Sequence, residues 1–232
     1  VLGHSTSSGQ GGIVPGSITL LGGEPGIGKS TILMQLASSL PETFYVSGEE
    51  SVAQIKMRAD RLKIKAQNIN LISETNVDAI IATLQKNKPG LVIIDSVQTM
   101  YSEDFPSTAG SIVQVRESAL RLQKYAKKYD VPVILVGHVT KDGSVAGPKT
   151  LEHMVDVVLY LEGERFHDLR ILRSTKNRFG STDEIGIFEI NETGLNEVKN
   201  PSKLFLSEKS KKSAGSVVTA TIEGTRPFLV EI

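Results

Sequence analysis

A glycine-rich stretch that ends in Lys29 and Ser30 carries the clearest chemistry in the sequence. It comprises Gly23, Glu24, Pro25, Gly26, Ile27, Gly28, Lys29 and Ser30, with Thr31 next. An apolar run precedes it and a helical pattern follows, which is the context of a phosphate-binding loop. Backbone N–H groups of such a loop face one cavity at the positive end of the helix dipole. The alternative, a glycine-rich hairpin that binds nothing, does not explain the complete motif.

The cofactors that this loop predicts are ATP or ADP and Mg²⁺. Lys29 should reach the β- and γ-phosphates, and the Ser30 hydroxyl should bind the metal ion. Asp95 is the second predicted metal residue, because it ends the run Leu91-Val92-Ile93-Ile94. A run of this kind is typical of a parallel strand buried on both faces, and its carboxyl end should lie beside the phosphate loop.

Three further positions could take part in hydrolysis. Glu49 and Glu50 follow the second predicted strand, and a carboxylate there can activate the attacking water. We predict that Glu49 is the base, although either glutamate could instead cap or solvate the next helix. His138 ends a later strand, where it could contact the γ-phosphate or be an ordinary core histidine.

Lys176 and Arg178 place two cations one residue apart in the stretch Lys-Asn-Arg-Phe-Gly. In an extended segment they share one face. They lie too far along the chain to belong obviously to its own phosphate pocket. Solvent-exposed strand cations are the alternative.

Composition sets limits on the partners. The 232 residues include 26 Lys and Arg, 26 Asp and Glu, and no cysteine, so a nucleic-acid contact must use a local basic cluster. Disulfides and cysteine-ligated zinc are excluded in this fragment.

No membrane-spanning run or signal-peptide pattern is present, and we expect a cytoplasmic protein with no membrane contact. The chain lacks an initial Met and ends in an apolar stretch, which suggests a piece of something longer.

The elements that must position these residues are βα units followed by a β-rich region. We expect strands near residues 18–21, 43–46, 70–72, 91–94, 131–136, 157–161, 169–173 and 185–190. Helices should follow the phosphate loop, the caps Ser51 and Asn76, and the long segment 96–110, with Val52 and Ile112 on buried faces. The predicted fold class is α/β, a mostly parallel doubly wound sheet with a C-terminal antiparallel extension.

Taken together, the motifs resemble the bacterial RadA/Sms family of RecA-like ATPases. The resemblance rests on the phosphate loop, Tyr-Val-Ser-Gly-Glu-Glu-Ser at 45–51, the run to Asp95 with Ser-Val-Gln-Thr, Val-Gly-His-Val-Thr-Lys at 136–141, Leu-Glu-His-Met-Val-Asp at 151–156 and Lys-Asn-Arg-Phe-Gly at 176–180. It implies a RecA-type core in a hexameric ring around single-stranded or branched DNA. ATP hydrolysis would drive translocation and branch migration in concert with the RecA recombinase. Lys176 and Arg178 would reach the γ-phosphate held by the neighbouring subunit.

The chain departs from this family at both ends. The family's four-cysteine zinc finger is missing, and its Lon-protease-like domain is represented only by what resembles a first strand. We expect a linker or added segment at 1–12, the ATPase core at 13–207, and a linker with a truncated domain start at 208–232.

Two kinds of function remain open from the sequence. In a DNA motor, the segments 99–111 and 140–149 would face nucleic acid, with Lys141 and Lys149 as phosphate contacts. In a protein similar to the clock ATPase KaiC, the same fold would use ATP as a switch or phosphoryl donor without DNA. The RadA signature favours the motor.

Overall fold

The structure is a computed structural model that describes residues 12–139, 148–163, 168–199, 218–223 and 226–231. Its strands are β1 (Ile18–Gly23), β2 (Thr43–Ser47), β3 (Ile69–Ser73), β4 (Leu91–Asp95), β5 (Val133–His138), β6 (Val157–Glu162), β7 (Leu169–Asn177), β8 (Ile185–Asn191), β9 (Gly194–Glu197), β10 (Val218–Glu223) and β11 (Arg226–Glu231). Its helices are α1 (Lys29–Ser39), α2 (Val52–Arg61), α3 (Val77–Asn87) and α4 (Ile112–Tyr129), with short 3₁₀ turns η1 (Ala66–Asn68), η2 (Val97–Thr99) and η3 (Pro148–Thr150).

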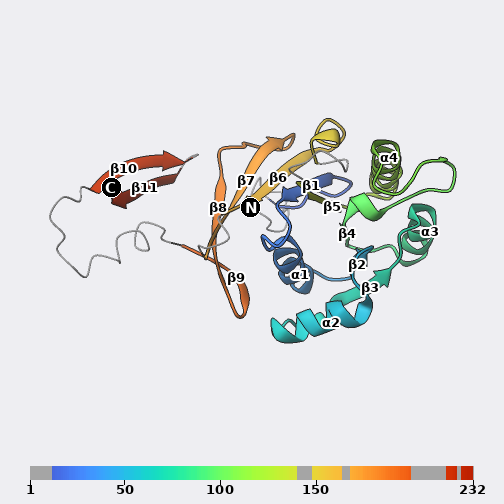
Figure 1. Ribbon diagram of the computed structural model, residues 1–232, viewed down its shortest axis with the longest axis horizontal. Helices are drawn as coiled ribbons and strands as arrows, with labels where there is room; N and C mark the ends of the chain where they lie inside the picture. Colours follow the sequence, from blue (N-terminus) through green and yellow to red (C-terminus); the bar gives the residue numbers. More distant parts are fainter. Residues whose placement is uncertain (1–11, 140–147, 164–167, 200–217, 224–225, 232) are drawn as a thin grey trace.

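One nine-stranded sheet organises the described residues, in the order β3-β2-β4-β5-β1-β6-β7-β8-β9 (Figure 1). The strands from β3 to β6 run parallel, and β6 to β9 pair antiparallel. β10 and β11 form a separate antiparallel pair. The predicted fold class, α/β with a C-terminal antiparallel extension, is confirmed.

The helices cover both faces of the sheet because alternate residues of the central strands point to opposite sides. Val92 and Ile94 of β4 pack with α3 and α4, whereas Leu91 and Ile93 pack with α1 and α2. Each central strand is therefore apolar throughout, as the sequence suggested. The parallel strands share a carboxyl edge, and the chain leaves β1, β2, β4 and β5 there to form the candidate site.

Side-chain caps start the helices where the sequence predicted. Ser51 forms a capping box with Gln54 at the start of α2, and the Asn76 side chain accepts from two backbone N–H groups at the start of α3. The predicted buried faces need two corrections. Val52 is 44% exposed and Ile112 is 58% exposed. Each is the first residue of its helix, one turn before the residues that reach the sheet, so solvent surrounds it.

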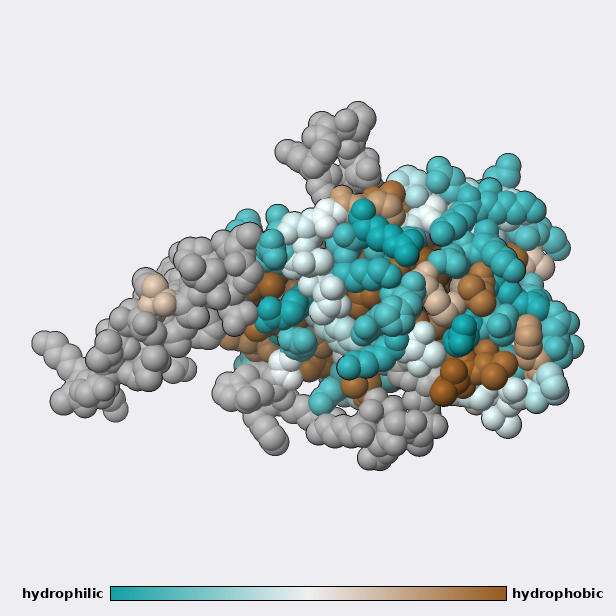
Figure 2. Space-filling view, turned by 90° about the horizontal axis from the view of Figure 1, so that it is seen from above, coloured by the Kyte–Doolittle hydropathy of each residue, from teal (hydrophilic) through white to brown (hydrophobic). Residues whose placement is uncertain are grey.

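The surface in Figure 2 is largely hydrophilic, with hydrophobic residues in several groups among the polar ones. The exposed large apolar side chains among the described residues are Val52, Met57, Ile112, Val113, Tyr129, Val139 and Phe179. None of the helices in the described ranges combines the length and apolarity needed to cross a bilayer.

Candidate nucleotide-binding site

The glycine-rich loop leaves β1 and turns directly into α1. Gly26 and Gly28 have φ angles of 78° and 114°, a conformation that residues with a side chain rarely adopt. The Lys29 ammonium is buried and donates to the carbonyl oxygens of Gly23 at 2.8 Å and Glu24 at 2.9 Å. Burial lowers the pKa of Lys29 from 10.5 to about 8, against the opposing attraction of Asp95, Glu49 and Glu24. The loop thus holds the Lys29 cation against its own backbone carbonyls.

Asp95 lies at the carboxyl end of β4 and is nearly buried. One of its carboxylate oxygens accepts a hydrogen bond from the hydroxyl of Tyr45 on the neighbouring strand β2. The Ser30 side chain lies near enough to that hydroxyl to oppose slightly the rise in the Tyr45 pKa that burial and Asp95 cause. Ser30 and Asp95 therefore meet around one point, and a hydroxyl with a carboxylate is a donor set that suits Mg²⁺. That Ser30 and Asp95 bind the ion stays a prediction.

The two glutamates after β2 have different surroundings. Glu49 accepts from the Ser96 hydroxyl at 2.6 Å, and its Oε1 lies 3.5 Å from His138 Nε2. The contact with His138, helped by Ser96 and the charge of Lys29, outweighs partial burial and lowers the pKa of Glu49 from 4.5 to about 2. Glu50 instead forms an ion pair with Arg58 of α2. Glu49 is thus an ionised acceptor that faces the site, while Glu50 supports a helix.

His138 is placed by a side chain that sequence reasoning did not single out. The Gln98 amide donates to the His138 carbonyl at 2.8 Å and accepts from the His138 N–H at 2.9 Å. The end of β5 is thereby joined to η2, which follows Asp95. Neither ring nitrogen of His138 has a hydrogen-bond partner among the described residues, apart from the longer ion-pair contact with Glu49.

Residues of the antiparallel extension contact the phosphate loop and the helix α1 that follows it. Arg170 of β7 is buried, and its Nε donates to the carbonyl of Ile27 at 3.1 Å. A methyl group of Leu195 would lie 3.1 Å from any Cβ added at Gly28. The Gln35 amide of α1 donates to the Leu195 carbonyl at 3.1 Å and accepts from its N–H at 3.0 Å. Strands that come last in the sheet therefore help to shape its first loop.

A cavity of about 540 Å³ opens beside Thr31, the residue after the predicted metal ligand Ser30. Its walls come from the end of α2, through Arg61, Leu62 and Lys63, and from the β8–β9 turn, residues 190–194. Two cations, Arg61 and Lys63, and one carboxylate, Glu192, thus line a space next to the phosphate loop.

Lys176 and Arg178 lie where the parallel strands begin, at the end of the sheet opposite the carboxyl edge that carries the phosphate loop. Asn177 between them pairs with Val157 of β6, and Val157 pairs with Thr19 near the start of β1. The phosphate loop begins four residues further on, about 13 Å along the strand at 3.3 Å per residue. Neither cation can therefore reach the phosphate loop of its own chain.

Residues just before β6 bind the side chains of Lys176 and Arg178. Lys176 Nζ donates to the carbonyls of Glu152 and Val155, both at 2.7 Å. The Arg178 guanidinium lies 3.1 Å from a carboxylate oxygen of Asp156.

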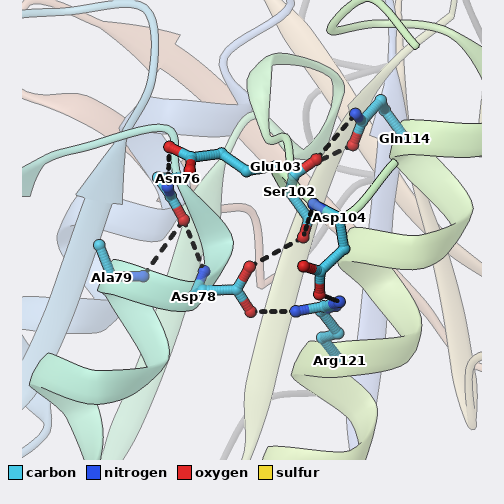
Figure 3. Close-up of polar contacts among 8 residues, drawn as sticks. All are labelled: Asn76, Asp78, Ala79, Ser102, Glu103, Asp104, Gln114 and Arg121. Atoms are coloured by element: carbon cyan, nitrogen blue, oxygen red, sulfur yellow. Dashed lines mark hydrogen bonds and ion pairs between the residues drawn. The ribbon is translucent and has the colours of Figure 1, made fainter. Parts of the chain in front are cut away.

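The predicted DNA-facing segments differ in what the structure describes. The segment 99–111 is well anchored: the Gln114 amide nitrogen lies 2.8–3.0 Å from the carbonyls of Ser102, Phe105 and Ser107, and its oxygen accepts from Ser102 N–H. Arg121 of α4 forms ion pairs with Asp78 and Asp104 (Figure 3). The segment carries Glu103 and Asp104 and no Lys or Arg. Lys149 is exposed in η3, and Lys141 lies outside the described residues.

Sequence reasoning missed Tyr45, Gln98 and Arg170. Tyr45 and Arg170 sit at buried strand positions, and a polar side chain at such a position needs a specific partner. That rule could have marked them. Gln98 follows Asp95 in a short turn, and no periodic pattern distinguishes it.

Comparison with known proteins gives a consistent result. A family model described as an AAA domain matches residues 9–144, more than half of the chain. The DNA repair protein RadA of Bacillus subtilis is 56% identical over 226 residues, which cover 96% of this chain and 49% of that protein. RadA of Streptococcus pneumoniae is 52% identical over 225 residues, with 96% and 54% covered. The chain spans about half the length of these relatives.

Two solved structures show the same fold. The RadB recombinase superposes with a TM-score of 0.61 at 23% identity and covers 82% of this chain and 94% of its own. A second solved structure, of an isolated ATPase domain, gives a TM-score of 0.67 at 16% identity, with 81% and 87% covered. The predicted RecA-like architecture and the resemblance to RadA are both confirmed.

Proposed function

The chain belongs to the AAA domain family and is homologous to the RadA DNA repair proteins, and on this premise we propose that it is the ATP-hydrolysing core of a DNA motor in recombinational repair. The observation that carries the proposal is the meeting of four groups at one edge of the sheet. Lys29, Ser30, Asp95 and Glu49 converge there from α1, β4 and the end of β2. These are the cation, metal ligands and water-orienting carboxylate that phosphoryl transfer from ATP needs.

The nucleotide would occupy two neighbouring spaces. Its phosphates would lie in the glycine-rich loop, where Lys29 exchanges its two backbone carbonyls for phosphate oxygens. Its nucleoside would extend into the cavity beside Thr31, between Arg61, Lys63 and the β8–β9 turn. A volume of about 540 Å³ falls within the range of small-molecule sites, which supports this placement.

Within this arrangement the residues of the site have separate roles in ATP hydrolysis. Ser30 and Asp95 would hold Mg²⁺, which would neutralise charge on the phosphates. Glu49 stays ionised at neutral pH and orients the attacking water by accepting its hydrogen bond. His138 lies against Glu49. It can therefore transmit a change at the γ-phosphate site to the segment that follows β5.

Replacement of one Glu49 carboxylate oxygen by an amide nitrogen tests whether Glu49 orients the attacking water. Glu49→Gln should bind ATP with unchanged affinity and lose at least 100-fold in kcat, about the smallest loss attributed to removing a catalytic base. Glu50→Gln is the matched control, because its partner is Arg58 rather than the site. It should retain most of the activity. Wild-type turnover by Glu49→Gln would mean that another group orients the water.

The DNA contact would be made by the segment after β5 rather than by 99–111. Phosphates of single-stranded or branched DNA require cations, and the exposed Lys149 offers one, with Lys141 as a further contact. Lys149→Ala should weaken single-stranded DNA binding and its stimulation of ATPase, with a less steep dependence on salt. Lys86→Ala, at the far end of α3, is the control and should change neither. Equal effects of the two variants would contradict the assignment of Lys149 as a DNA contact.

We further propose that Lys176 and Arg178 act on the ATP of a neighbouring copy. Their position at the edge opposite the phosphate loop supports a head-to-tail contact, which closes into a ring when the rotation permits. A cation supplied in trans stabilises the charge that develops on the transferring phosphoryl group. The whole assembly would be a hexamer that encircles DNA in the cytoplasm and works with the RecA recombinase.

A further inference from the structure

The hydroxyl of Tyr45 is a polar group on a side chain that belongs to an apolar layer. Tyr45 is fully buried in β2, in the cluster that contains Ile93 of β4 and the inner face of α1. Phenylalanine would fill the same space without the cost of burying a hydroxyl, which is tolerated only when the group is hydrogen-bonded. The presence of a tyrosine at this position therefore requires an explanation from its partners.

Both partners of the hydroxyl belong to the predicted metal site. Tyr45 pairs with Ile93 across the two strands, so Asp95, two residues further along β4, lies on the same face and within reach. The hydroxyl donates to Oδ2 of Asp95. The Ser30 side chain at the start of α1 also lies near this hydroxyl. One rigid ring thus connects a helix and a strand that share no backbone hydrogen bond.

We propose that Tyr45 is a positioning residue for the predicted magnesium site, and that its hydroxyl keeps the Asp95 carboxylate oriented beside the Ser30 hydroxyl. The inference rests on the proposed nucleotide-binding function of the same site. The hydroxyl engages one carboxylate oxygen and leaves the other available to a metal ion or its water. Groups that orient metal ligands in this way change metal affinity or activity by about 10- to 100-fold when they are removed.

Tyr45→Phe isolates the hydroxyl, because it keeps the ring and its packing. The affinity of ADP is measured twice, in EDTA and with saturating Mn²⁺, and Mn²⁺ binding to the ADP complex is followed by electron paramagnetic resonance. We expect unchanged ADP affinity in EDTA and Mn²⁺ binding weakened by about 10- to 100-fold. Tyr125→Phe is the matched control: its hydroxyl is also buried but lies 3.4 Å from the Leu84 carbonyl, outside the site. It should change neither value.

Two results would overturn the proposal. Unchanged Mn²⁺ binding would show that Asp95 and Ser30 hold their positions without the hydroxyl. An equal loss of ADP affinity in EDTA and in Mn²⁺ would assign Tyr45 a general structural role. A wild-type protein that binds no nucleotide would instead contradict the proposed function itself, so the two failures are distinct.

A second measurement applies if Tyr45→Phe does not fold. The chain has five tyrosines, so 3-fluorotyrosine labelling of the wild-type protein gives few ¹⁹F resonances. The Tyr45 signal is assigned as the one that remains after the other tyrosines are replaced in turn. It should shift when Mg²⁺ is added to the ADP complex, and the Tyr125 signal should not. A Tyr45 signal that is insensitive to Mg²⁺ would overturn the proposal.

Discussion

At the scale of single residues, the charge of Lys29 is the property on which the proposed phosphate binding would depend most directly. Its ammonium is surrounded by backbone and shielded from water, which disfavours the charged form and brings its pKa to about 8. A bound phosphate would restore the charged form. Nucleotide binding above pH 8 must therefore include the uptake of a proton.

We predict that ADP affinity, measured in EDTA to exclude the metal ion, falls as the pH rises above 8. The slope should approach tenfold per pH unit, because one proton is taken up for each nucleotide bound. Below pH 8 Lys29 is already protonated, and its contribution should be independent of pH. Lys29→Arg is the control, since a guanidinium stays charged over this range and should give a flat profile. A slope in the arginine variant would assign the pH effect to another group.

At the scale of elements, the segment between β4 and α4 shows which interactions hold a loop in place. Arg121, with its two acidic partners, is the more conspicuous feature of Figure 3. Those carboxylates are substantially exposed, and such ion pairs contribute at most about 1 kcal/mol. Gln114 is buried and satisfies several backbone groups, each of which costs about 1–3 kcal/mol when left without a partner.

We therefore predict that Gln114→Leu, which preserves the side-chain volume, destabilises the protein by about 2–5 kcal/mol and increases hydrogen exchange at residues 102–107. Arg121→Met should cost less than about 1 kcal/mol. Urea unfolding of the two variants measures the difference. Larger destabilisation by Arg121→Met would show that the ion pairs, rather than the amide, anchor this segment.

The same scale shows what could be predicted from the sequence. Each central strand was found because burial on both faces makes it uniformly apolar, and the helix starts were found because Ser51 and Asn76 are local caps. β9 was missed: its short sequence, Gly194–Glu197, is half exposed and has no apolar run. Its pairing with β8 and its contact with Gln35 depend on residues far away in the chain. The partners of Tyr45 and Gln98 depend on strand order, which local patterns do not contain.

At the scale of the whole molecule, the separation of Lys176 from the phosphate loop predicts a defined result for mixed assemblies. Lys29→Ala and Lys176→Ala proteins should each be inactive alone. In an equal mixture, random assortment pairs an intact loop with an intact Lys176 at roughly a quarter of head-to-tail contacts, so roughly a quarter of wild-type ATPase should return. Glu184→Ala, an exposed change elsewhere in the extension, is a control that should leave activity intact. No recovery despite demonstrated co-assembly, or full activity of monomeric Lys176→Ala, would exclude action in trans.

The position of β1 in the sheet has a consequence for how the protein is made. β1 leaves the ribosome before every other described strand, yet it lies between β5 and β6, and Ile18 pairs with Val133. At 5–20 residues per second, its first neighbour follows it by roughly 6–23 s. Throughout that interval the glycine-rich loop has no sheet to support it, and the contacts of Arg170 and Leu195 come later still. A nascent chain released before these strands emerge would carry the entire phosphate-binding motif and lack the fold that gives it shape.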